Sequence, residues 1–135
     1  MATIETRYLG DLRTEMKHLQ SGSVVLTDAP TDNNGKGEAF SPTDLVAAAL
    51  GSCMLTIMGI AARTHNFSID GTTLEITKVM SSEPRRIGRI EIKVNIPHDH
   101  NAKTRAIIER AAATCPVEHS LHPDIERVIT FNYDK

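Results

Sequence analysis

The sequence predicts a single α+β domain over residues 1–135, with largely antiparallel sheets and one long buried helix. Segments in which apolar and polar residues alternate are grouped before and after one long helical segment. In α/β folds, by contrast, strands alternate regularly with helices. The length of 135 residues is that of one domain.

We expect about three short antiparallel strands in residues 1–28. Apolar residues recur there at every second position, as is typical of half-buried strands. The pairs Gly10-Asp11 and Ser21-Gly22 have the composition of tight turns and divide the segment. The polar, glycine-rich residues 29–37 that follow predict a loop.

A helix is predicted from Ser41 to about Arg63. Ser41 can cap it, Pro42 fits its first position, and Asp44 completes a capping box. Residues 45–62 carry no charge, so we expect this helix to be buried on every side. Their number just reaches that of a membrane span. Frequent Ala, Gly, Ser and Thr, and the lack of interfacial aromatic residues, argue against a membrane.

The second half of the chain predicts two strands joined by a turn, two helices and a last strand. In order, these elements are expected at residues 72–80, 87–96, 103–114, 115–121 and 127–133. One sheet of this chain can cover only one side of a helix that is apolar all round. We therefore expect a homodimer with a hydrophobic interface.

Composition excludes several classes of partner. The net charge is −2 with both signs interspersed, and the chain has three Phe, two Tyr and no Trp. Without a basic surface or aromatic residues for stacking, we expect no binding to nucleic acid. The N-terminal residues lack the apolar segment of a signal peptide, so a cytoplasmic location is expected. There, a pair of cysteines is more often catalytic or metal-binding than structural.

The two cysteines occupy different local settings. Cys115 precedes Pro116 at the entrance of a short helix, where free N–H groups predict a lowered pKa and a thiolate. Cys53 lies in the middle of the long helix, where burial alone would raise its pKa, so a reactive thiol there needs a nearby cation. The alternative, in which Cys53 is a small core residue and Cys115 only a helix cap, stays open.

The histidines suggest two further alternatives. Cys115, His119 and His122 recur at helical spacing and could hold zinc, but Pro123 would end the helix and only one cysteine takes part. A hydrolase using Cys115 with His119 lacks an orienting acid and an oxyanion-hole pattern. We therefore expect no metal and no other cofactor, with His119 as a supporting residue hydrogen-bonded near Cys115.

Two segments resemble the OsmC/Ohr family. The segment SPTDLVAAALGSCMLTI (residues 41–57) is similar to the helix that carries the family's first reactive cysteine. The segment ATCPVEHSL (residues 113–121) is similar to the family's Cys-Pro motif before a short helix. Their order and spacing match, and the resemblance spans nearly the whole chain. It implies an intertwined homodimer, with sheets wrapped around two central helices and two active sites at the interface.

The resemblance also implies an activity, that of a thiol-dependent peroxidase for organic or small hydroperoxides. Cys53 would be the peroxidatic cysteine, which becomes a sulfenic acid, and Cys115 the resolving cysteine, which forms a disulfide with it. A dithiol such as a lipoylated protein would reduce the disulfide. The alternative is a catalytically weak OsmC-like protein that senses redox state or binds a ligand.

In the family, an arginine from an early strand pairs with a glutamate near the start of the long helix and holds the thiolate. By resemblance, Arg13 is that arginine. Thr43 stands where the glutamate is expected; Asp44 is one residue further on, and Glu38 lies in the preceding loop. This departure is more similar to the OsmC-like branch than to the Ohr branch, and it keeps the catalytically weak alternative open.

Overall fold

The computed structural model of the protein describes residues 1–134. The chain divides into two compact units, Met1–Val46 and a second unit from Ala47 onward, and the boundary falls within the first turns of the long helix. The single domain predicted over residues 1–135 stays a prediction.

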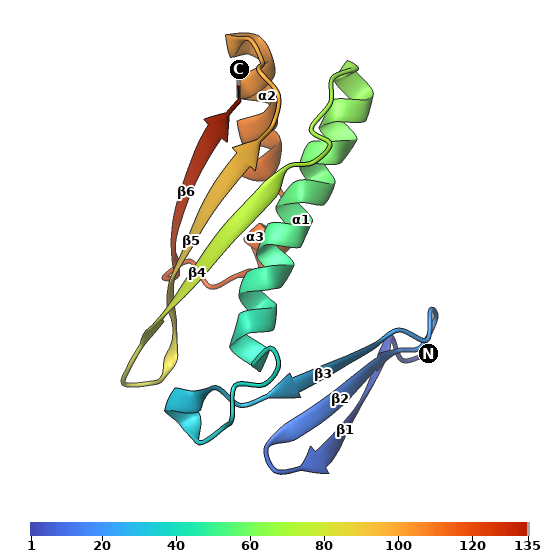
Figure 1. The fold of residues 1–135 in the computed structure, drawn as a ribbon, viewed down its shortest axis with the longest axis vertical. Helices are drawn as coiled ribbons and strands as arrows, with labels where there is room; N and C mark the ends of the chain where they lie inside the picture. Colours follow the sequence, from blue (N-terminus) through green and yellow to red (C-terminus); the bar gives the residue numbers. More distant parts are fainter. Residues whose placement is uncertain (135) are drawn as a thin grey trace. The chain divides into compact units, whose positions relative to one another are not determined.

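The first unit contains the three predicted strands. They are β1 (Ile4–Gly10), β2 (Arg13–His18) and β3 (Val24–Asp28), which form an antiparallel sheet in the order β1-β2-β3 (Figure 1). Both predicted turns are present. Gly10 has a φ of 91° and Gly22 a φ of 78°, a backbone conformation that favours glycine. The three-strand prediction is confirmed.

The predicted loop after β3 folds back on itself and contains the short 3₁₀ helix η1 (Thr31–Asn33). The amide of Gly35 donates to the carbonyl of Pro30 at 3.0 Å, and the amide of Gly37 donates to that of Ala29 at 3.2 Å. A Cβ atom at Gly35 would lie 1.7 Å from the carbonyl oxygen of Ala29, so only glycine fits this turn.

The long helix α1 (Pro42–His65) begins with the predicted capping box. The amide of Asp44 donates to the Ser41 hydroxyl at 3.1 Å, and the amide of Ser41 donates to the Asp44 carboxylate at 3.0 Å. The helix ends at His65, and Asn66, which follows, has a left-handed φ of 60°. Both ends therefore follow from local sequence.

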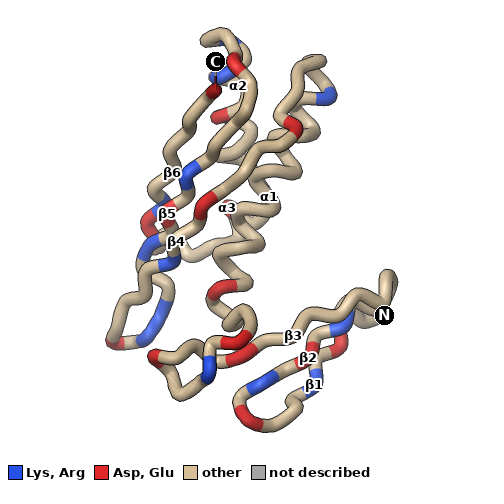
Figure 2. Tube along the Cα trace, viewed as in Figure 1, with Lys and Arg blue, Asp and Glu red and all other residues tan. Residues whose placement is uncertain are grey.

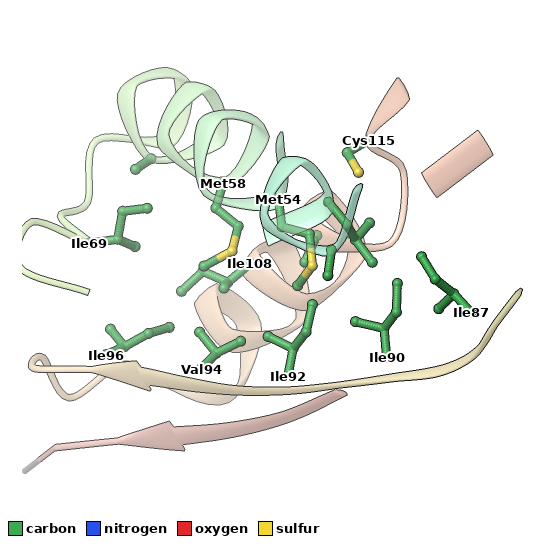
Figure 3. Packing of buried hydrophobic residues seen from close by; sticks show 14 residues of the cluster. Met54, Met58, Ile69, Ile87, Ile90, Ile92, Val94, Ile96, Ile108 and Cys115 are labelled. Atoms are coloured by element: carbon green, nitrogen blue, oxygen red, sulfur yellow. The ribbon is translucent and has the colours of Figure 1, made fainter. Parts of the chain in front are cut away.

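The second unit has one mixed sheet with helices on one side (Figures 1 and 3). Strands β4 (Thr73–Ser81), β5 (Arg86–Ile96) and β6 (Glu126–Tyr133) pair in the order β4-β5-β6. β6 runs parallel to β5, because the chain crosses back through α2 (Ala102–Ala112) and α3 (Pro116–Ser120). The other strand pairs are antiparallel, so the predicted α+β class with largely antiparallel sheets is confirmed.

The core lies between this sheet and the helices α1 and α2 (Figure 3). Its largest fully buried apolar side chains come from α1, β5 and α2: Leu50, Met54, Met58, Ile90, Ile92, Val94, Ile96 and Ile108. Full burial of one such side chain contributes roughly 1.5–3 kcal/mol to stability. The core therefore fixes the face of α1 that meets the sheet.

Within one chain, α1 is buried on one side only. The buried residues recur at helical spacing: Ala47, Leu50, Gly51, Met54, Met58 and Ala62. On the other side, Ile60 is 56% exposed. The helix is nevertheless uncharged between Asp44 and Arg63, as Figure 2 shows. The predicted burial on every side is thus not reached by a single chain, and the open side would need another molecule to cover it.

By length and composition α1 could also cross a membrane. This property is weak evidence for a span, since core helices of soluble proteins share it. The packing of α1 against the sheet of the second unit gives its apolar residues another explanation.

Candidate active site

The two cysteines come together in the second unit. Cys53 lies on α1 and is half-buried, and Cys115 directly precedes α3 and is fully buried. Both are free thiols. They lie close enough for Cys53 to influence the pKa of Cys115, although β4, β5 and α2 separate them in sequence. The fold therefore forms a dithiol from its two cysteines.

Cys115 acts as the N-cap of α3. Its backbone is extended (φ −74°, ψ 150°), and Pro116 takes the first helical position. The amide of Glu118 donates to its Sγ at 3.3 Å, so a thiol does what a serine or aspartate oxygen does in most caps. The predicted place of Cys115 at a helix entrance is confirmed.

The predicted effect on its acidity is wrong, because the pKa of Cys115 is raised. Burial is the largest cause; the Glu118 amide opposes it, and the Cys53 thiol and the Glu118 carboxylate add to it. A helix of five residues provides this sulfur with one N–H donor, which does not replace the lost water. Cys115 is therefore a neutral thiol near pH 7.

His119 and His122 do not form the arrangement with Cys115 that the sequence suggests. The ring of His119 is exposed, and its contact with Cys115 is made by the backbone, whose amide donates to the Cys115 carbonyl at 3.2 Å. α3 ends at Ser120, so His122 does not continue the helical face considered for zinc. Among residues 1–134, no group of three or more His, Cys, Asp or Glu side chains could hold a metal ion.

Arg13 sits in a cluster of charges within the first unit. Its guanidinium forms an ion pair with Glu38, and its Nη2 lies 3.6 Å from the carboxylate of Asp28. Arg13 and Asp28 are paired across β2 and β3, and the loop after β3 brings in Glu38. The ion pair with Glu38 raises the pKa of Arg13. Arg13 is thus charged and interacts with two carboxylates, those of Glu38 and Asp28.

Asp28 ties this cluster to the backbone. Its Oδ2 accepts a hydrogen bond from the Glu38 amide at 3.0 Å, and its side chain is buried. This amide and the charge of Arg13 lower the pKa of Asp28 against the effect of burial. No sequence motif marks Asp28; its place at the strand end opposite Arg13 is the signal that could have found it.

The three residues considered in place of the family glutamate have different surroundings. Glu38 contacts Arg13. Asp44 caps α1, and the Thr43 hydroxyl lies 3.3 Å from that of Ser41. Glu38 therefore pairs with the candidate arginine.

Comparison with known proteins shows the family of the chain. The sequence model of the OsmC-like protein family matches residues 35–129, which include both cysteines. The chain belongs to the OsmC-like family. Comparison with curated proteins gives no match.

Solved structures of OsmC-like proteins and their relatives share this fold. A Psychrobacter arcticus protein, provisionally named an osmotic stress-induced and detoxification response protein, is 51% identical, with a TM-score of 0.95 and coverage of 98% of this chain and 96% of that one. An organic hydroperoxide resistance protein OsmC from Legionella pneumophila is 14% identical, with a TM-score of 0.77 and 98% coverage of both chains. One from Elizabethkingia anophelis is 18% identical, with a TM-score of 0.77 and coverage of 99% and 98%. At these lower identities the likeness concerns the fold.

Proposed function

We propose that the protein is a thiol-dependent peroxidase that reduces organic hydroperoxides through Cys53 and Cys115. The observation that carries this proposal is the proximity of two free thiols from distant parts of the sequence. The Legionella pneumophila and Elizabethkingia anophelis proteins of the same fold bear the name of organic hydroperoxide resistance proteins, which supports the substrate class.

The reaction has three steps. The Cys53 thiolate attacks the terminal peroxide oxygen; an S–O bond forms, the O–O bond breaks, and the alcohol leaves with a proton. The sulfur of Cys115 then attacks the sulfenic acid; an S–S bond forms, and the hydroxyl leaves as water with the proton of Cys115. A dithiol reductant, for which a lipoylated protein is the proposed partner, returns two electrons and reopens the disulfide.

The surroundings of the thiols support these roles. Cys53 is only half-buried, so a peroxide can reach it. Cys115 is fully buried with a raised pKa, which suits a thiol that stays neutral until a sulfenic acid forms beside it. By resemblance to the family, in which an arginine of an early strand holds the thiolate, we assign to Arg13, held by Glu38 and Asp28, the stabilisation of the Cys53 thiolate. A positive charge beside a thiol lowers its pKa.

We also propose that the protein is a homodimer in the cytoplasm. The buried hydrophobic residues of the described chain all lie between Ala47 and Cys115. The sheet of the first unit instead exposes large apolar side chains: Ile4, Tyr8, Leu9, Val24, Val25 and Leu26. With the open side of α1, these are surfaces that a second copy would bury.

Light scattering at micromolar concentration should give twice the chain mass of 14.8 kDa. Replacing Ile60, on the exposed side of α1, by glutamate should shift the protein towards monomer, because a charge would then be buried without a partner. Thr130→Glu, which adds the same charge at an exposed position of β6, is the control. A monomer mass for the unmodified chain would contradict the dimer.

Peroxide consumption tests the function directly. The purified protein should consume cumene hydroperoxide over many turnovers when a reductant is present, and dihydrolipoamide should support a higher rate than dithiothreitol. A protein that removes no hydroperoxide within minutes at millimolar peroxide is not a peroxidase. That result would favour the redox-sensing or ligand-binding alternative.

A further inference from the structure

Arg127, near the start of β6, holds together the chain that follows Cys115. Its Nε donates to the Glu118 carboxylate at 3.2 Å, and its Nη2 donates to the Glu118 carbonyl at 3.4 Å. Its Nη1 donates to the carbonyl of His122 at 3.2 Å and to that of Ile125. One guanidinium thus binds both ends and the middle of the segment 118–125.

The ion pair in this arrangement is mostly buried. The side chains of Arg127 and Glu118 are 15% and 25% exposed, whereas those of the ion pair Arg105–Asp99 are 38% and 60% exposed. A buried ion pair with further hydrogen bonds has a better-defined geometry than an ion pair in water, because both long side chains have few alternative conformations.

Glu118 links this anchor to the thiol. Arg127 binds the carboxylate and the carbonyl of Glu118, and the amide of Glu118 donates to the Sγ of Cys115. α3 has only five residues and cannot hold its own geometry, since a single helical turn is marginal without outside contacts. The direction of the N–H that meets the sulfur therefore depends on Arg127.

We propose that Arg127 is a positioning residue for the resolving thiol: by holding Glu118 and the segment 118–125, it keeps the Sγ of Cys115 placed to form a disulfide with Cys53. This inference rests on the proposed function, in that it concerns the disulfide step of that reaction. Arg127 does not touch the reacting atoms; it acts through Glu118.

The charge of Arg127 works in the same direction. Burial raises the pKa of Cys115 most; the Glu118 carboxylate adds a smaller rise, and pairing with a cation limits that smaller rise. Loss of Arg127 should therefore both misplace the sulfur and disfavour its thiolate. The attack of Cys53 on a peroxide should be unaffected, whereas closure of the disulfide should slow.

The test follows disulfide closure with diamide, which needs no reactivity towards peroxide. Diamide accepts two electrons and two protons from the pair of thiols and becomes a hydrazine, leaving the Cys53–Cys115 disulfide. The measurement is the rate of closure, as a function of pH, for the unmodified protein and for Arg127→Gln, Arg127→Lys and Glu118→Gln.

Arg127→Gln should close the disulfide about tenfold more slowly or worse, since misplacement by about 1 Å can cost up to 10²-fold. Its pH profile should move to higher pH, because the unpaired Glu118 carboxylate raises the pKa of Cys115 further. Arg127→Lys should fall in between, as an ammonium can pair with the carboxylate but cannot reach all the carbonyls. Glu118→Gln, which keeps the amide and removes the charge, should move the profile to lower pH.

Arg105→Gln is the matched control, since Arg105 also donates to a carboxylate and a carbonyl, those of Asp99 and His100, but in the first turn of α2. It should close at the unmodified rate. Equal rates for Arg127→Gln and the unmodified protein would overturn the proposal, and so would equal slowing by Arg105→Gln. Closure by diamide but not by hydroperoxide would contradict the peroxidase function alone and leave the Arg127 result valid.

Discussion

Replacing Cys53 by serine should abolish hydroperoxide consumption and leave Cys115 largely reduced. In the proposed reaction only Cys53 meets the peroxide, and Cys115 reacts with the sulfenic acid that forms there. With one equivalent of organic hydroperoxide, the unmodified protein should lose both free thiols and give a Cys53–Cys115 disulfide by mass mapping. A core cysteine and a helix cap without redox function would give neither result.

Cys115→Ser separates the two steps. This variant should stop at a sulfenic acid on Cys53, which dimedone traps, and should then over-oxidise, because no thiol is present to resolve it. The rate at which Cys53 first reacts should stay close to that of the unmodified protein. The loss should therefore appear in turnover and not in the first oxidation.

The acidity of Cys115 gives an independent check of these roles. In Cys53→Ser, alkylation of Cys115 should be slow at pH 7 and rise with pH beyond the range of an ordinary thiol, because burial, the largest cause of its raised pKa, remains. If Cys115 is instead the faster of the two thiols near neutral pH, the peroxidatic and resolving roles are reversed.

Removing Arg13 should have the next largest effect. A nearby positive charge lowers the pKa of an acidic group by about 1–3 units, so Arg13→Ala should slow alkylation of Cys53 near neutral pH by about tenfold or more. Peroxide consumption should fall by a similar factor. Arg13→Lys should recover only part of the rate, since a point charge cannot engage Glu38 and a thiolate as a planar guanidinium does.

Arg7→Ala is the control for Arg13. Arg7 lies on the neighbouring strand β1, carries the same charge and is exposed, so its removal should leave alkylation of Cys53 unchanged. The opposite pattern, with Arg7→Ala slow and Arg13→Ala unaffected, would transfer the thiolate-stabilising role to Arg7. Unchanged rates for both variants would exclude both arginines from that role.

Local rules predicted most of the fold. The capping box at Ser41 and Asp44, the turns at Gly10 and Gly22, and the alternation along β5 each depend on residues close in sequence. The parallel pairing of β6 with β5 does not, because it depends on where two intervening helices return the chain. The one-sided burial of α1 is likewise set by distant strands.

The same distinction applies to the site. Motifs pointed to both cysteines, but the acidity of Cys115 was predicted with the wrong sign, because its burial comes from packing and not from its helix entrance. Spacing alone does not select Glu38 as the partner of Arg13, because the loop after β3 is what brings the two together. Arg127 has no motif at all; only the return of β6 beside α3 gives it a partner.

The sulfur that caps α3 also links the stability of this helix to the reduction potential of the two cysteines. The N–H···S hydrogen bond from Glu118 belongs to the dithiol form, and a helix cap is worth on the order of 1 kcal/mol. If oxidation weakens this hydrogen bond, the lost free energy stabilises the dithiol relative to the disulfide. For a two-electron couple, losing all of it would raise the reduction potential by roughly 20 mV. The first turn of α3 would therefore help to set how strong a reductant the proposed disulfide requires.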